Sequence, residues 1–429
     1  MKGMMFVMKK NSDKAFKKLD ELWEEELLFL KTLGSYKSTL LNEKNLQMFI
    51  KNHLDDMGLN THYFDIEPDK IAHYNNYGEP NWLCENRPVV VGENKSRGLK
   101  TGKSLILQGH VDVVSAEPEH MWDTDPYCPT VIDNKMYGRG ICDMKSGVAA
   151  MIYAVKAINE SGLELGADLQ IQTVIEEECT GNGALALLER GFVADAAIIP
   201  EPTELKAISS QVGVIWLQVK VIGSGAHVER AEKAVNAINK AAYLIQIIDE
   251  YREYINTESK NNEFIEHPHP LNVNVGVIKG GDWASNVPSE CTFEVRIGLY
   301  PEQDPKEVQN EIKKWILKGA SKDEWLNENS PEITFYGFKA PGTIVNKDSD
   351  LMKALEEAHL TTHNEKMETK PFTATTDIRA FHEFGIPATC YGAKGENMHG
   401  INEYIDLVTL KKATQTLISL ILNWCEVNE

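Results

Sequence analysis

Apolar and polar residues alternate along the first 58 residues with the spacing of two amphipathic helices. The first predicted helix covers residues 12–33 and begins beside a serine and an aspartate that can cap it, and the second ends at Gly58. From residue 87 onwards, short apolar runs alternate with longer helical stretches. This order is typical of a mostly parallel sheet with helices on both faces, so the sequence predicts an α/β domain. Its predicted strands cover residues 87–93, 103–110, 168–177 and 194–202, with helices over 146–162 and 183–191.

The pattern changes near residue 212, where apolar and polar residues alternate as in strands with one face in water. The order strand, helix, strand, strand, helix predicts a small antiparallel sheet with two helices on one face. From residue 332 the first pattern returns, beginning with a strand over 332–338. We therefore expect a larger domain made of residues 1–211 and 332–429, with an α+β domain of residues 212–331 inserted into it. The inserted domain should hold a four-stranded antiparallel sheet and two helices.

Composition narrows the classes of function. The 429 residues are enough for two hydrophobic cores, and 44 basic against 64 acidic residues give a formal net charge of −20. This charge disfavours binding to nucleic acids and to anionic membranes. No apolar run approaches the roughly 20 residues of a membrane span, and the apolar centre of residues 1–10 is too short for a signal peptide. The seven scattered cysteines form no CxxC pair, so we expect reduced thiols and a cytoplasmic protein.

Several predicted strands are followed by residues that can bind a metal. In an open α/β sheet the carboxyl ends of the strands line the ligand crevice, so these side chains should meet there. Carboxylates gathered at one place raise one another's pKa and destabilise the fold unless a cation neutralises them. The sequence therefore predicts a metal site. The candidate residues are His110, Asp143, Glu177, Glu178, Glu201 and His399.

The number of candidate donors favours two divalent metal ions, zinc or alternatively cobalt. Such ions accept about four nitrogen or oxygen donors each. Two ions that share one carboxylate lie about 4 Å apart, an arrangement that activates water and polarises an acyl oxygen. Glu177 would then be free to act as general base. The expected ligands are His110, Asp143 and Glu201 for one ion and Asp143, Glu178 and His399 for the other, with Asp143 shared.

Each of these residues has a simpler interpretation when taken alone. Asp143 could cap the helix that begins near residue 146, and Glu201 could end a strand before Pro202. The run of three glutamates could be a solvated turn, and a single His-x-Asp at a strand end is often an ordinary hydrogen-bonded pair. The ordered set, rather than any single member, favours the metal site.

The order and spacing of these segments resemble the M20 family of co-catalytic metallohydrolases, over nearly the whole chain. The resemblance implies a phosphorylase/hydrolase-like catalytic domain, a lid or dimerisation domain, the ligands named above, and Asp112 as the residue that orients His110. The family usually has Asp-Glu-Glu where this chain has Glu176-Glu177-Glu178, so the register of base and ligand could shift by one. The spacing to "CTGNGA" favours Glu177 as base and Glu178 as ligand. The segments are "GHVDVVSAEPEHMW", "GRGICDMKSG", "EEECTGNG", "IIPEPTE", "GENMHG", "GSGAHVERAEKAVNAINKA" and "SNVPSECTFEVR".

The same resemblance implies a zinc-dependent hydrolase of C–N bonds in linear amides. The branch that it favours contains acetylornithine deacetylases and succinyl-diaminopimelate desuccinylases, so the expected substrate is an N-acyl amino acid or a related small amide. A metallo-dipeptidase or aminopeptidase on the same scaffold is the alternative. A catalytically silent binding protein is a third hypothesis, which the completeness of the site disfavours.

Three further residues are expected at the substrate. In the family, a histidine and an asparagine that match His227 and Asn286 reach the oxyanion of the neighbouring active site, which implies a homodimer. Arg379 lies in "TATTDIRAF", which is similar to the family's Thr-Asp loop, and it could bind a substrate carboxylate through two parallel contacts. A structural ion pair between Arg379 and Asp377 is the alternative.

Overall fold

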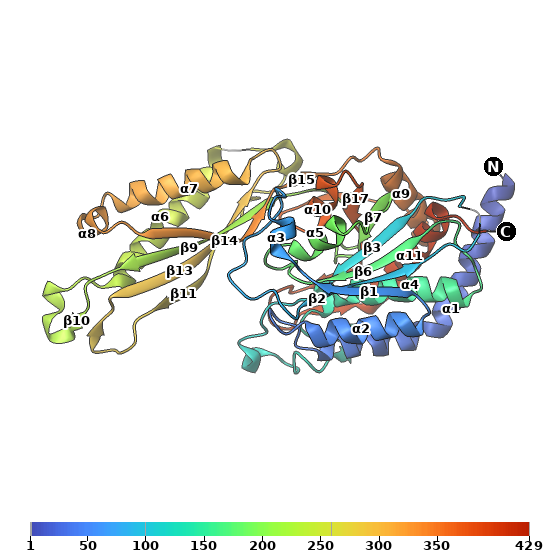
Figure 1. Ribbon diagram of the computed structural model, residues 1–429, viewed down its shortest axis with the longest axis horizontal. Helices are drawn as coiled ribbons and strands as arrows, with labels where there is room; N and C mark the ends of the chain where they lie inside the picture. Colours follow the sequence, from blue (N-terminus) through green and yellow to red (C-terminus); the bar gives the residue numbers. More distant parts are fainter. Residues whose placement is uncertain (1, 99, 259, 429) are drawn as a thin grey trace.

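The computed structural model shows an elongated molecule in two parts (Figure 1). It describes residues 2–98, 100–258 and 260–428, with side chains from residue 10 onwards; Met1 lies outside this range, and residues 2–10 form the start of the first helix. The larger part carries both chain ends at its far side, and the smaller part projects away from them. Within the described residues, none of the helices combines the length and apolar character that crossing a membrane requires.

A six-stranded sheet forms the centre of the larger part, in the order β1-β2-β6-β3-β7-β17. Strands β6, β3, β7 and β17 are parallel, and β2 pairs antiparallel with both β1 and β6. All strands but β2 therefore point the same way, which confirms the predicted mostly parallel sheet. The strands are β1 (Asn60–Asp65), β2 (Pro88–Asn94), β3 (Leu105–His110), β6 (Leu169–Val174), β7 (Ala196–Ile199) and β17 (Ala388–Cys390).

Helices cover both faces of this sheet, as predicted. Helix α4 is apolar on nearly every side because it lies between the sheet and two other helices, α1 and α11. The first group of helices is α1 (Lys2–Ser35), α2 (Lys44–Asp56), α4 (Ser146–Glu160), α9 (Asp350–His363) and α11 (Leu407–Trp424). The opposite group is α3 (Pro68–Ile71), α5 (Asn182–Glu189) and α10 (Ile378–Glu383).

Two small sheets flank the central one. The first has the order β15-β8-β16 and the second the order β18-β19-β5-β4. Their strands are β8 (Ala207–Gln211), β15 (Thr343–Ile344), β16 (Thr369–Phe372), β4 (Thr130–Ile132), β5 (Lys135–Tyr137), β18 (Gly395–Glu396) and β19 (Tyr404–Asp406).

The smaller part, called the lid here, is an antiparallel sheet in the order β11-β13-β9-β14 that packs against helices α6 and α7. Four strands and two helices confirm the predicted lid architecture. The lid has its own hydrophobic core, separate from the core of the larger part. Its elements are β9 (Gly213–Ile222), α6 (Ala237–Glu258), β11 (Val273–Gly280), β13 (Glu290–Leu299), α7 (Pro305–Ala320) and β14 (Glu332–Ala340), with a short helix α8 (Glu324–Glu328).

One detail of the lid differs from the sequence analysis. Strand β14 pairs with β9 in the lid sheet, although residues 332–338 were assigned to the larger domain; the local pattern of one strand does not say which sheet it joins. Helix α6 begins at Ala237, where the Asn236 side chain accepts hydrogen bonds from the N–H groups of Ile238 and Asn239 and caps the helix. The other domain boundaries stay a prediction.

The chain passes between the two parts at two adjacent strands. Pairing of β14 with β9 continues across the junction into pairing of β15 with β8. The strands approach so closely there that a Cβ on Gly213 would lie 2.4 Å from the carbonyl oxygen of Ala340, and one on Gly342 would lie 2.9 Å from the carbonyl oxygen of Gln211. Glycine is therefore the residue that fits both positions.

Glu26 on α1 is a carboxylic acid inside the helical layer. It is fully buried, accepts a hydrogen bond of 2.9 Å from the Thr414 hydroxyl on α11, and leaves its Oε2 without a partner among the described residues. Burial raises the pKa of Glu26 to about 8. The acid is therefore protonated in the folded protein at neutral pH.

Replacement of Glu26 by glutamine should change how stability depends on pH. The folded protein keeps a proton that the unfolded chain releases above its ordinary pKa of 4.5, so the wild type should lose stability as the pH rises from there to about 8. The loss is at most about 1.4 kcal/mol per pH unit, and Glu26→Gln should lack it. Urea unfolding at several pH values measures this difference. The exposed Glu24, replaced in the same way, is the control; a Glu26→Gln curve parallel to the wild-type curve would contradict the expectation.

Candidate metal centre

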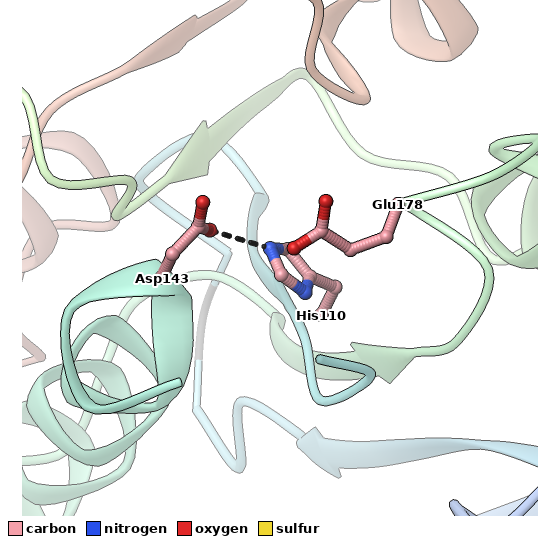
Figure 2. Close-up of side chains that lie close together, drawn as sticks. All are labelled: His110, Asp143 and Glu178. Carbon is pink, nitrogen blue, oxygen red and sulfur yellow. Dashed lines mark hydrogen bonds and ion pairs between the residues drawn. The ribbon is translucent and has the colours of Figure 1, made fainter. Parts of the chain in front are cut away.

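The predicted ligands meet at the carboxyl ends of three parallel strands. His110 is the last residue of β3, the turn with Glu178 follows β6, and Glu201 follows β7. Asp143 lies just before α4, and His399 lies in the loop between β18 and β19. Ligand atoms of His110, Asp143 and Glu178 all lie within 4.8 Å of one another, and Figure 2 shows these side chains facing a common point.

Asp143 stands between two groups of donors. Its Oδ1 lies 3.0 Å from His110 Nε2, and its Oδ2 lies 3.5 Å from His399 Nε2. Glu201 Oε1 is 3.8 Å from His110 Nε2, and Glu178 Oε1 is 2.9 Å from His399 Nε2. The five predicted ligands thus form two groups, His110 with Glu201 and Glu178 with His399, and one carboxylate faces both.

Electrostatics at the site follow from burying these charges. Burial alone would lower the pKa of His110, but the hydrogen bond to Asp143 and the charge of Glu201 raise it well above its ordinary value. The charge of Glu178 is the main cause that raises the pKa of His399 to about 11. Burial, and then the charge of Asp143, raise the pKa of Glu201. The site therefore favours positive charge at its centre, whether as protons or as a cation.

Asp112 contacts His110 differently from the expectation. The Nδ1 of His110 lies 3.0 Å from the backbone oxygen of Asp112, whereas the Asp112 carboxylate is 3.6 Å away. A proton on Nδ1 would donate to this backbone oxygen and leave Nε2 free to bind a metal. The Asp112 carboxylate instead accepts the N–H of Glu178 at 3.1 Å, so one residue positions two of the predicted ligands.

The three consecutive glutamates have different surroundings. Glu176 is fully buried and accepts hydrogen bonds from Trp82 Nε1 at 2.8 Å, from the Thr180 hydroxyl at 2.7 Å and from Arg87, none of which is a predicted ligand. Arg87 also pairs with the buried Glu43. Glu176 is therefore engaged in holding the turn, which leaves Glu177 and Glu178 for the crevice and favours the predicted register.

Glu177 is buried, and its Oε1 has no hydrogen-bond partner among the described residues. Burial is the main cause that raises its pKa well above the ordinary value, and the charges of Asp377 and Glu201 add to this. An unpaired buried carboxylate beside metal-type donors fits a group that exchanges protons.

His227 and Asn286 lie opposite each other in a two-stranded ribbon at the tip of the lid. The ribbon pairs β10 (Ala226–His227) with β12 (Asn286–Val287), and both side chains are exposed. Figure 1 places β10 at the end of the lid farthest from β3, so the structure brings these residues together but not to the ligands of the same chain. His227 Nδ1 accepts the N–H of Glu229 and so caps the short helix of residues 228–233.

The structure does not support Arg379 as a group for a substrate carboxylate. Its side chain is buried, and its guanidinium donates to the backbone oxygens of Thr376 at 2.7 Å and Thr180 at 3.2 Å. Asp377 lies 3.8 Å away, so the structural ion pair is the better description. A Cβ on Gly181, which has φ of +76°, would overlap the guanidinium, and this shows how tightly Arg379 is enclosed.

Gln108 and Asp377 are buried polar residues that the sequence analysis does not single out as site residues. Gln108 Nε2 donates to Asp377 Oδ2 at 2.9 Å, and the charge of Asp377 acts on Glu177. The available signal was a glutamine inside the apolar strand "LILQGH", two residues before His110 and therefore on the same face of the strand. This pair forms a polar layer behind the ligands.

The donor set fits divalent cations such as zinc. Imidazole nitrogen and carboxylate oxygen are both suitable donors, and a cation would offset the mutual repulsion of the buried acids. Glu177 Oε1 and Asp112 Oδ1 have no hydrogen-bond partner among the described residues. The side chains of the protein therefore do not compensate all of these buried carboxylate oxygens.

Two substitutions among the glutamates should have opposite effects on the metal-free protein. Glu176→Ala leaves the buried Arg87 without one partner, and breaking a buried ion pair costs about 3–5 kcal/mol. Glu177→Gln removes a carboxylate whose charged form is disfavoured by burial, so it should raise the unfolding temperature. Calorimetry after treatment with a chelator measures both. A loss of stability in Glu177→Gln as large as in Glu176→Ala would contradict this division of roles.

Comparisons with known proteins show the family to which this chain belongs. The model of "Peptidase family M20/M25/M40" matches residues 106–423. The N-formyl-4-amino-5-aminomethyl-2-methylpyrimidine deformylase of Halalkalibacterium halodurans is 28% identical over 434 residues, 96% of this chain and 97% of that protein. The acetylornithine deacetylase of Proteus mirabilis is 28% identical over 358 residues, 80% of this chain and 88% of that protein.

Among solved structures, human carnosine dipeptidase 1 has the same fold. Its TM-score is 0.79 at 18% identity, over 97% of this chain and 100% of that one. The family model covers well over half of this chain, and it does so across the strands that carry the predicted ligands. The protein therefore belongs to the M20 family of metallopeptidases and amidohydrolases, and it is a hydrolase.

Proposed function

We propose that the protein is a two-metal amidohydrolase that removes a small acyl group from an N-acyl amine. The observation that carries the proposal is Asp143, whose two carboxylate oxygens face His110 and His399 respectively. One divalent ion, zinc or cobalt, would be held by His110, Glu201 and Asp143, and a second by Glu178, His399 and Asp143. Ions bound there would lower the pKa of a water and polarise the acyl oxygen.

Glu177 is the proposed general base and acid. Its raised pKa and its unpaired Oε1 suit a group that takes a proton from the attacking water and returns it to the departing nitrogen. The water oxygen forms a bond to the acyl carbon, the C–N bond breaks, and the amine leaves with that proton. Asp112 holds both His110 and the backbone of Glu178 in place during these steps.

We propose a formyl group as the first acyl group to test. The deformylase relative aligns over 96% of this chain, including the lid, whereas the acetylornithine deacetylase aligns over 80%. N-acetyl or N-succinyl amino acids are the second candidate class, although Arg379 is not available to bind their carboxylate. A dipeptidase activity is the alternative, and the similarity of fold to carnosine dipeptidase 1 is what supports it.

We further propose that the active unit is a homodimer. His227 and Asn286 form an exposed pair at the lid tip, far from the ligands of their own chain, so a partner chain would have to receive them. The Nδ1 of His227 accepts a backbone N–H, so a neutral ring carries its proton on Nε2, which can donate to an oxyanion.

A hydrolysis screen tests the proposed function. Enzyme reconstituted with zinc or cobalt should release formate from heteroaromatic compounds that carry an N-formylated aminomethyl group. This reaction should be faster than the deacylation of N-acetyl or N-succinyl amino acids and faster than the cleavage of dipeptides. Glu177→Ala is the control, because it should keep both ions but lose about 10²- to 10⁴-fold in kcat. Faster cleavage of dipeptides would favour the alternative, and no hydrolysis of any amide would contradict the proposal.

Complementation between two inactive variants tests the homodimer. Glu177→Ala and His227→Ala should each be inactive or nearly so, with loss of His227 costing about a hundredfold in kcat. After dissociation and reassembly together, one site in each mixed dimer should combine an intact Glu177 with the partner chain's intact histidine, and activity should return. Confirmed subunit exchange without activity would show that His227 does not act across the dimer.

A further inference from the structure

Asp143 and His399 lie at the ends of two chain segments that separate where one pair of strands ends. We call these two segments the arms of a fork. Strands β5 and β19 pair antiparallel up to Tyr137 opposite Tyr404, and beyond them the N–H of Gly138 donates to the backbone oxygen of Glu403 at 3.0 Å. One arm runs from this ladder through residues 139–143 and ends at Asp143. The other arm, read in the opposite direction, runs through residues 403–399 and ends at His399.

Arg139 and Glu403 stand at the base of the two arms. Both side chains are buried and form an ion pair with each other. Neither residue contacts the predicted metal position directly; each lies four positions along the chain from the ligand on its own arm. The two arms therefore contain the same number of residues.

The Glu403 carboxylate holds the opposite arm through its backbone. It accepts the N–H groups of Gly140 at 3.0 Å, Cys142 at 2.8 Å and Asp143 at 3.1 Å. Hydrogen bonds to a buried carboxylate are strong, and three of them along one short segment fix its path. The backbone of Asp143 is thus held by a side chain from the His399 arm.

Arg139 holds the other arm in return. Its guanidinium donates to the Gly400 backbone oxygen at 3.0 Å, next to His399, and lies over the Trp122 ring at 5.2 Å. Each arm is therefore fixed by a side chain from the base of the other arm, and we call this arrangement the cross-brace. The distance between Asp143 and His399 depends on both contacts.

We infer that the cross-brace of Arg139 and Glu403 sets the separation of Asp143 and His399 and thereby the affinity for the second metal ion. The inference rests on the proposed two-ion function. Two of the three proposed protein ligands of the second ion lie on the braced arms, whereas only Asp143 is braced for the first ion. Disturbing the cross-brace should therefore weaken the binding of the second ion more than the binding of the first.

Calorimetric titration of metal-free protein with zinc tests the inference. Glu403→Gln has the same shape, but its amide would place N–H groups against the backbone N–H groups that the carboxylate accepts. The dissociation constant of the second ion should rise about 10- to 100-fold, as when outer partners of metal ligands are lost, and that of the first ion by a clearly smaller factor. The visible spectrum of cobalt at the second site should change in parallel.

Arg139→Lys is the second variant, and it keeps the charge beside Glu403 while losing the planar contact to Gly400. Arg139→Lys should also weaken the binding of the second ion selectively. The test therefore stays informative if Glu403→Gln does not fold. Glu26→Gln, a buried glutamate on α1 that makes no contact with the fork, is the matched control and should leave both dissociation constants unchanged.

The results of the titration bear separately on the cross-brace and on the proposed two-ion function. An equal rise in both dissociation constants would mean a general structural role and would overturn the inference, as would unchanged constants in folded variants. In either case a wild type that binds two ions leaves the proposed function standing. A wild type that binds a single zinc ion at saturation would overturn the two-ion function and the inference with it.

Discussion

The burial of several carboxylates around one imidazole is the constraint on which the rest of this structure depends. Asp143, Glu177 and Glu201 lie within the same crevice as His110, and burial raises the pKa of Glu177 and Glu201. Such a group of acids is unfavourable in the protein alone, so the surrounding backbone has to hold it in place. Buried ion pairs do this on two sides, with Arg87 and Glu176 fixing the turn after β6, and with Glu403, the partner of Arg139, fixing the segment before α4. The fold thus accepts a local cost where the chemistry requires negative charge.

Much of this arrangement could be predicted from the sequence, because the carboxyl ends of parallel strands share one edge. The periodicity of β3, β6 and β7 identified the strands, and their order implied that His110, Glu178 and Glu201 would meet. The run of three glutamates was ambiguous by one position, since all three have the same chemistry. Only their partners separate them: Glu176 is engaged by Trp82 and Arg87, and these come from a segment about 90 residues earlier in the chain.

Other features depend on contacts that no local pattern records. The assignment of β14 to the lid required knowledge of its pairing with β9, and the burial of Arg379 required the positions of Thr180 and Thr376. For Asp112 the atom that meets His110 differs from the expected one, because it is the backbone oxygen rather than the carboxylate. That the candidate ligands gather at one place was therefore predictable from chemistry and order, whereas most of the contacts that hold them there were not. The cytoplasmic location stays a prediction.

The junction at Gly213 and Gly342 has a mechanical consequence. The chain passes between the two parts only in this paired two-stranded ribbon, where close backbone contact leaves no room for side chains. Further contacts hold the base of the lid to the larger part, because the N–H of Gly337 in β14 donates to the Glu79 backbone oxygen at 2.7 Å and the Asn272 side chain donates to the Thr373 backbone oxygen at 3.2 Å. Any rotation of the lid about this base would displace the tip with β10, which lies farthest from β3, more than the residues beside the junction.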